Sequence, residues 1–268
     1  MRTLLLQQLR DRRASMVGWT LGWLTLVGMY VATWPTIKTH GRQYDDILRG
    51  LPSALRSVLG SQSGGAFSTP AGYFTAELLA ITGPLVAITM GVLLGAGLLA
   101  RDEEDGSLEL LLAQPVSRTT VLLSRVTVAG AELVGVLALA GLALFASGLL
   151  VDLHVGVTTC LPATAMLALL GVQAMTLALL VGAVSGRSTP ARAVAGAAGL
   201  VAFLLNALGP SISWLSGVVP VSPFHTLMAS DPFRRMPPGT SVLTLVAPAA
   251  AFAAAAVVLF RRRDLRLR

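Results

Sequence analysis

The sequence predicts an all-α integral membrane protein with six transmembrane helices. Hydrophobic residues make up 54% of the chain and charged residues only 12%, whereas roughly a quarter of the residues in a soluble domain are charged. Six apolar runs reach the length of about 20 residues that crosses the hydrocarbon core of a bilayer. The Lys and Arg residues gather at the ends of these runs, as cytoplasmic anchors do. A nucleic-acid-binding protein is thereby excluded, because its basic residues would line one face.

The first 13 residues are predicted to form a helix that lies in the membrane interface. Leu5, Leu6 and Leu9 recur on one side and the arginines lie elsewhere, which suits a helix with its cations toward anionic headgroups. A cleaved signal peptide is the alternative. It fits less well, because the following apolar run continues to about Trp34 without a clear cleavage site of small residues.

The predicted spans cover residues 14–34, 77–100, 121–151, 159–184, 193–215 and 241–260, within a single domain, 1–268. Between the first two spans, the helical spacing of apolar residues predicts two short outer helices, interrupted by Gly50 and Pro52. Residues 216–240 hold five prolines among apolar residues. This mixture predicts short broken helices that dip into the outer leaflet, with a plain loop as the alternative.

The distribution of basic residues predicts the orientation of the chain. Six spans place both termini on one side, and that side holds 14 Lys and Arg residues against six on the other. The positive-inside rule therefore places both termini in the cytoplasm. The basic residues are almost all arginine, which indicates a GC-rich genome, and we expect a multi-pass protein of a bacterial plasma membrane.

Residues 101–118 lie between the second and third spans and hold several charged residues between two apolar runs. This stretch is called the coupling segment below. Asp105 or Ser107 can cap a short helix, and Pro115 would end it. Leucines of this helix would share one face, with Glu109 pointing away. A solvated loop is the alternative, but apolar residues in a cytoplasmic turn need a surface to cover them, such as a groove on a soluble partner.

The coupling segment resembles the cytoplasmic coupling segment of ABC transporter permeases of the ABC-2 exporter superfamily. The residues that carry the resemblance are Glu103, Glu104, Gly106, Leu108, Glu109, Leu110, Leu111, Leu112, Ala113, Pro115, Val116, Ser117 and Arg118. A second stretch resembles the re-entrant outer segment before the last span of the same superfamily. It consists of Ser222, Pro223, Phe224 and His225, followed by Asp231 and Pro232.

This resemblance implies a pair of six-span permeases, each docked through its coupling segment on a cytoplasmic ABC ATPase. The second permease would be another copy of this chain or a paralogue. ATP and Mg are expected on the ATPase, and no cofactor is expected on this chain. Because the spans are mostly apolar, an amphipathic or hydrophobic substrate is preferred: a drug, an antibiotic or a lipid.

The residues themselves agree that any ATP is hydrolysed by another chain. A phosphate-binding loop needs glycines before its lysine, and Lys38, the only lysine, has none in that pattern. His40, His154 and His225 are far apart in sequence and Cys160 stands alone, so no metal site is predicted. A membrane protease using paired glutamates is disfavoured, since the arginine and histidine that it needs are missing.

Four polar residues within or beside apolar spans are candidates for a substrate path. They are Glu77, Glu132, Gln173 and Asn206. Ionisable groups at membrane depth are costly and often functional. For Glu77 the preferred interpretation is an interfacial carboxylate that opens its span. Glu132 fits an interhelical hydrogen bond as well as it fits a substrate contact. Gln173 and Asn206 fit helix-to-helix hydrogen bonds. If either glutamate carries protons, the chain is instead a proton-coupled secondary transporter that needs no ATPase.

Overall fold

The computed structural model describes residues 10, 12–51, 67–99, 117–151, 153, 156–209, 212 and 214–262. These residues form helices and connecting turns, without strands. Six helical stretches are long and apolar enough to cross a membrane: Arg13–Gly41, Pro70–Gly97, Thr119–Leu150, Val157–Ser185, Ser188–Leu208 and Gly239–Arg262. The all-α fold with six spans is therefore confirmed. The interfacial helix predicted for the first 13 residues lies almost wholly outside the described residues.

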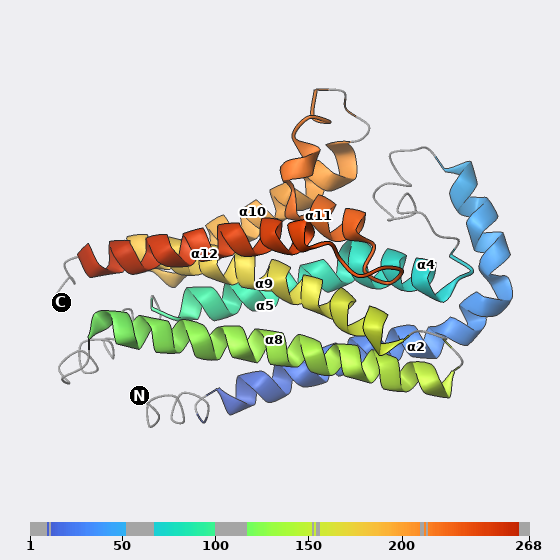
Figure 1. Cartoon of the computed structure of the whole chain (residues 1–268), viewed down its shortest axis with the longest axis horizontal. Helices are drawn as coiled ribbons and strands as arrows, with labels where there is room; N and C mark the ends of the chain where they lie inside the picture. Colours follow the sequence, from blue (N-terminus) through green and yellow to red (C-terminus); the bar gives the residue numbers. More distant parts are fainter. Residues whose placement is uncertain are drawn as a thin grey trace.

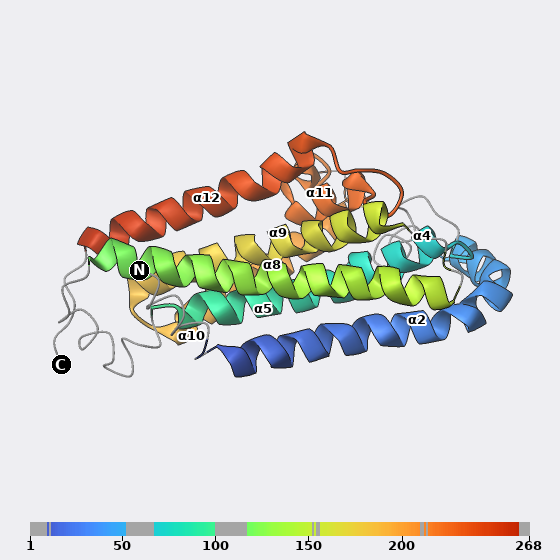
Figure 2. The same ribbon diagram turned by 60° about the horizontal axis from the view of Figure 1, so that its bottom comes forward.

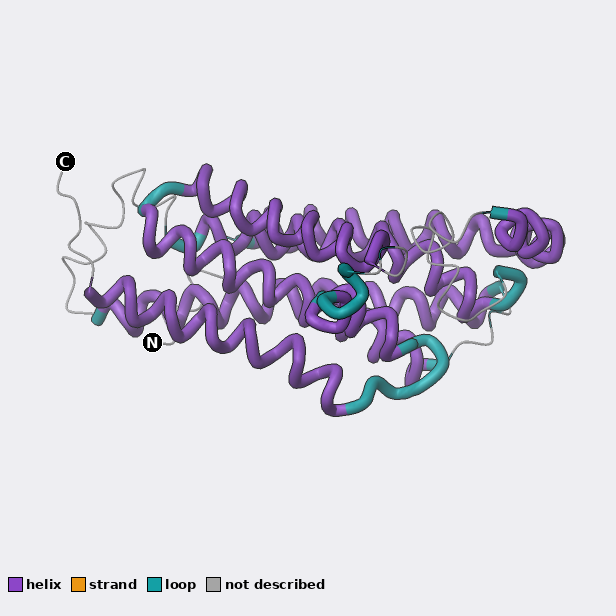
Figure 3. Tube along the Cα trace, turned by 90° about the horizontal axis from the view of Figure 1, so that it is seen from above, coloured by secondary structure: helices purple, strands orange, loops and turns teal. Residues whose placement is uncertain are grey.

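The spanning helices lie along one common direction for most of their length, and the start of α2 and the end of α12 lie toward the same end of the bundle (Figures 1 and 3). In chain order, the spanning helices are α2 (Arg13–Gly50), α5 (Gly83–Gly97), α8 (Arg118–Leu150), α9 (Val157–Ser185), α10 (Ser188–Leu208) and α12 (Gly239–Arg262). The end where α2 starts and α12 ends is called the terminal end below. The opposite end is called the distal end.

The first span does not end at Trp34. Helix α2 continues through Pro35 to Gly50, and its last turns bend away from the bundle at the distal end (Figure 1). A proline removes one hydrogen bond and kinks a helix without necessarily ending it. The first of the two predicted outer helices is thus continuous with the span. The second falls in residues 52–66, outside the described residues.

The second span begins at Pro70, before the predicted start at Glu77. Thr69 caps the short helix α4 (Pro70–Phe74), accepting a hydrogen bond from the Gly72 amide at 3.2 Å. A wide π-helical segment, η1 (Thr75–Thr82), then leads into α5 at Gly83. Pro84 has no N–H to donate, which is a recognised cause of such irregular turns. Glu77 therefore lies inside the span, within the π-helical segment, and does not open it.

Helix α9 occupies the centre of the bundle, among α5, α8, α10 and α12 (Figure 2). Its closest neighbour is α5, where glycines allow the backbones to touch. A Cβ added at Gly91 would collide with the carbonyl oxygen of Gly171, and one at Gly95 with that of Met175. Small residues serve the same purpose in other membrane helices, because apolar side chains gain little by leaving lipid for protein.

The outer segment before the last span is partly helical. Helix α10 ends at Leu208, not at residue 215, and is followed by the short 3-10 helix η3 (Val219–Val221) and by α11 (Pro223–Ser230). Ser222 donates a hydrogen bond to the Ala202 carbonyl at 2.8 Å, which ties this segment to α10. Phe224 is only 3% exposed. The segment thus contains short helices, as expected. Its insertion into a leaflet stays a prediction.

Candidate functional site

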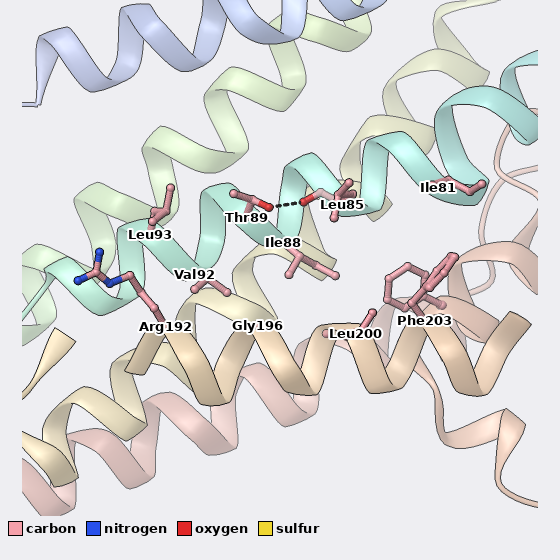
Figure 4. Close-up of a pocket in the computed structure, with 12 residues that line it drawn as sticks. Ile81, Leu85, Ile88, Thr89, Val92, Leu93, Arg192, Gly196, Leu200 and Phe203 are labelled. Atoms are coloured by element: carbon pink, nitrogen blue, oxygen red, sulfur yellow. Dashed lines mark hydrogen bonds between the residues drawn. The ribbon is translucent and has the colours of Figure 1, made fainter. Parts of the chain in front are cut away.

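An elongated apolar pocket of about 410 Å³ lies between α5 and α10 (Figure 4). It is lined by Ile81, Leu85, Ile88, Thr89, Val92, Leu93, Arg192, Gly196, Gly199, Leu200, Phe203 and Phe224. This volume falls in the range of about 300–1,000 Å³ that is typical of small-molecule sites. We call it the α5–α10 pocket.

Small residues on α10 open this pocket. Gly196 has no atom near the position that a Cβ would take, and a Cβ on Gly199 would meet only the Ile88 side chain, at 3.0 Å. Because neither glycine has a side chain, α10 leaves a groove along α5. Leu85 and Leu200 at its rim are 62% and 59% exposed. The pocket is therefore open along one side, toward lipid or a second protein.

The two ends of the α5–α10 pocket differ in chemistry. Arg192 lies at the terminal end, and its Nε and Nη2 donate to the carbonyl and hydroxyl oxygens of Ser188 at 3.2 and 3.0 Å. Phe203 and Phe224 meet edge to face at the other end, with ring centroids 5.6 Å apart. The pocket is thus cationic at one end and aromatic at the other.

A second cavity, of about 200 Å³, adjoins the first and shares Ile88, Gly199 and Phe224 with it. Gln173 lines this second cavity, and its Oε1 is buried with no hydrogen-bond partner among the described residues. The interhelical hydrogen bond considered for Gln173 is therefore not formed here. Asn206 is half-buried on α10 and is not among the residues that line these two cavities.

Glu132 lies near the middle of α8 and forms an interhelical contact with the start of α2. Its side chain is buried, accepts a hydrogen bond from the Ser15 hydroxyl at 2.7 Å, and pairs with the Arg12 guanidinium at 3.2 Å. Of the two interpretations left open by the sequence, the structure favours this link between α2 and α8 over a substrate contact. The sequence signal that was missed is Arg12 itself, which was read only as an interfacial cation.

The structure does not bring Glu77 and Glu132 together. Glu77 lies in η1, close to where the second span begins at the distal end, whereas Glu132 contacts the start of α2 at the terminal end. Among the described residues, no group of three His, Cys, Asp or Glu side chains is placed to hold a metal ion.

The coupling segment lies outside the described residues up to position 116. Its last two residues are placed: Ser117 caps α8 by accepting a hydrogen bond from the Thr120 amide at 3.1 Å, and Arg118 begins the helix. The helices that flank the segment, α5 and α8, end and begin at the terminal end (Figure 1). Arg125 of α8 donates to the Leu98 carbonyl at 2.7 Å and so joins these two helix ends. The roles of Glu103, Glu104, Gly106, Leu108, Glu109, Leu111, Leu112 and Pro115 remain predictions.

The described helices and the pocket define a multi-pass membrane protein with an apolar cavity open along one side. A family model described as "ABC-2 family transporter protein" matches residues 2–265, and the chain belongs to this family. The resemblance first seen in the coupling segment is thereby confirmed over nearly the full length. Comparison with curated proteins finds no match.

Proposed function

We propose that this chain is the membrane permease subunit of an ATP-driven ABC exporter. It would form, with a second permease, the path of an amphipathic or hydrophobic substrate, and would be driven by separate cytoplasmic ATPase subunits. The match to the ABC-2 transporter family over residues 2–265 carries this proposal. Membership of that family implies an ABC transporter complex with ATPase partners.

Two further observations support it. The coupling segment connects α5 to α8, and both of these helices meet it at the terminal end, which the basic residues assign to the cytoplasm. An ATPase docked there would push on the two helix ends that Arg125 joins. The α5–α10 pocket then supplies an apolar surface that a second permease could complete, because its open side exposes large leucines.

The proton-coupled alternative has less support. Glu132 is already bonded to Arg12 and Ser15, so a proton pathway would have to depend on Glu77. Only the ABC interpretation also accounts for the charges and leucines of the coupling segment.

The test is charge reversal in the coupling segment. Glu104→Lys and Glu109→Lys replace attraction to a basic partner with repulsion, and we expect the affinity for the ATPase to fall about tenfold to a hundredfold, or about 1 to 3 kcal/mol. ATPase co-purification and transport are measured after membrane expression is confirmed. Neither carboxylate lies in a predicted membrane span, so insertion should be unaffected.

The matched control is Lys38→Glu, a charge reversal at an exposed residue of α2 on the distal side. It should retain the ATPase at the parental level. Parental ATPase binding and transport in both glutamate variants would show that the segment is a passive loop, and the proposed coupling would be wrong.

A further inference from the structure

We propose that the α5–α10 pocket binds a long-chain anion, with its headgroup at Arg192 and its apolar chain between α5 and α10 (Figure 4). This assignment rests on the proposed function, because it names the class of molecule that the permease carries. Three features of the pocket support it: its charge, its length and the chemistry of its walls.

The charge of the pocket selects an anion. Arg192 is the one charged residue among the described residues that line it. The contacts from Nε and Nη2 to Ser188 hold the guanidinium in place. Arginine carries five N–H donors, so donors remain, including both on Nη1, for a carboxylate or phosphate. Such charge-assisted hydrogen bonds are about twice as strong as neutral ones.

The length of the pocket matches one lipid-like chain. Arg192 and Phe203 are eleven residues apart on α10, which is about 16 Å at about 1.5 Å per residue. The hydrocarbon core of a bilayer is about 30 Å thick, so one leaflet spans about 15 Å. A chain that starts at Arg192 would therefore reach the aromatic pair of Phe203 and Phe224, where the pocket ends.

The walls exclude strongly polar ligands. Thr89 is the one hydroxyl residue in the described lining, and its Oγ1 already donates to the Leu85 carbonyl at 2.7 Å. A sugar or nucleotide bound here would leave its own hydroxyl groups without partners, and burying each one would cost about 1–3 kcal/mol. An alkyl chain has no such groups to satisfy.

The test is direct binding of radiolabelled dodecyl phosphate to the purified chain in phosphatidylcholine nanodiscs, without an ATPase. Dodecanol, with the same chain and no charge, should bind at least about tenfold more weakly, as expected for the loss of charge-assisted hydrogen bonds. Arg192→Gln should weaken dodecyl phosphate binding by a similar factor, about tenfold. Arg192→Lys, which keeps the charge, should lose less, because lysine retains the charge without the bidentate geometry.

Three further variants test whether the ligand binds in the pocket and not through general surface charge. Arg187→Gln removes a cation just before α10 that does not line the pocket, and it should leave the affinity unchanged. Gly196→Leu places a side chain where no atom lies within 4 Å, so the chain should still fold while its pocket is filled. Gly18→Leu on α2 is its control, since that position is equally open. Only Gly196→Leu should abolish binding.

The inference is overturned if dodecanol binds as tightly as dodecyl phosphate, or if Arg187→Gln weakens binding as much as Arg192→Gln. Competition by phosphatidylglycerol added to the nanodiscs would support the inference, because that lipid is itself a long-chain anion. Binding is measured without an ATPase. A negative result for dodecyl phosphate binding therefore does not contradict the proposed coupling to an ATPase. Parental ATPase binding in the glutamate variants likewise does not contradict binding of a long-chain anion.

Discussion

Glu132 joins the start of α2 to α8 through Arg12 and Ser15, and it is buried to 1% exposure. Removing one partner of a buried charged contact leaves the other without compensation. We therefore expect Glu132→Ala to lower the free energy of unfolding in a detergent titration by about 1.5–3 kcal/mol, the range for hydrogen bonds to charged groups. Ser15→Ala should cost about 1.5 kcal/mol, the lower end of this range, since one donor to the carboxylate is lost while Arg12 stays paired with it.

A double-mutant cycle separates this contact from the general effect of each substitution. If Arg12 and Glu132 interact, the loss in Arg12→Ala/Glu132→Ala should be smaller than the sum of the two single losses, by about 0.5–3 kcal/mol. Additive losses would contradict the ion pair. If Glu132→Ala abolishes transport while its free energy of unfolding stays parental, Glu132 is again a candidate for the substrate path.

At the scale of elements, the close contact of α5 with α9 rests on three glycines: Gly91 and Gly95 of α5 and Gly171 of α9. Gly95→Ala would place its Cβ against the Met175 carbonyl oxygen, and overpacking of this kind costs about 1–3 kcal/mol. Gly97 lies two residues further along α5 and has nothing within 4 Å of its Cβ position. Gly97→Ala should be neutral or stabilising by up to about 1 kcal/mol, because alanine is the better helix former.

The same titration, with both variants in one detergent, checks this contrast. Equal effects of Gly95→Ala and Gly97→Ala would mean that α5 and α9 do not approach as closely as the structure shows. A loss of stability in Gly95→Ala alone would confirm the close approach of the α5 and α9 backbones at Gly95, next to the α5–α10 pocket.

At the scale of the whole molecule, the 14 basic residues on one side and six on the other predict that both termini face the cytoplasm. In a Cys160→Ala background, a cysteine at Ser63 should react with a membrane-impermeant thiol reagent in intact cells, and one at Ser107 should not. Cys160 is buried, so replacing it removes a thiol without exposing a new surface. Labelling of Ser107 from outside would reverse the orientation and remove the coupling role.

Local signals in the sequence determined much of the fold. The apolar runs predicted six spans, and Ser117, a residue type that favours helix caps, does cap the helix that follows the coupling segment. Helix ends were less certain where a proline intervened: α2 passes Pro35, and the second span starts at Pro70. A proline restrains only its own turn, so its neighbours decide whether it bends a helix or ends it.

The contacts between helices were decided only by the tertiary structure. In a membrane span, residues that face lipid and residues that face protein are both apolar, so periodicity does not reveal which side packs inward. The sequence therefore did not predict that Gly91 and Gly95 face α9, or that Arg12 reaches Glu132. The sequence analysis counted Arg192 only as one of the 14 basic residues on the side of the two termini. Only the packing of α10 beside α5 places that charge at the end of an apolar pocket, because residues about 100 positions apart in sequence build the two walls.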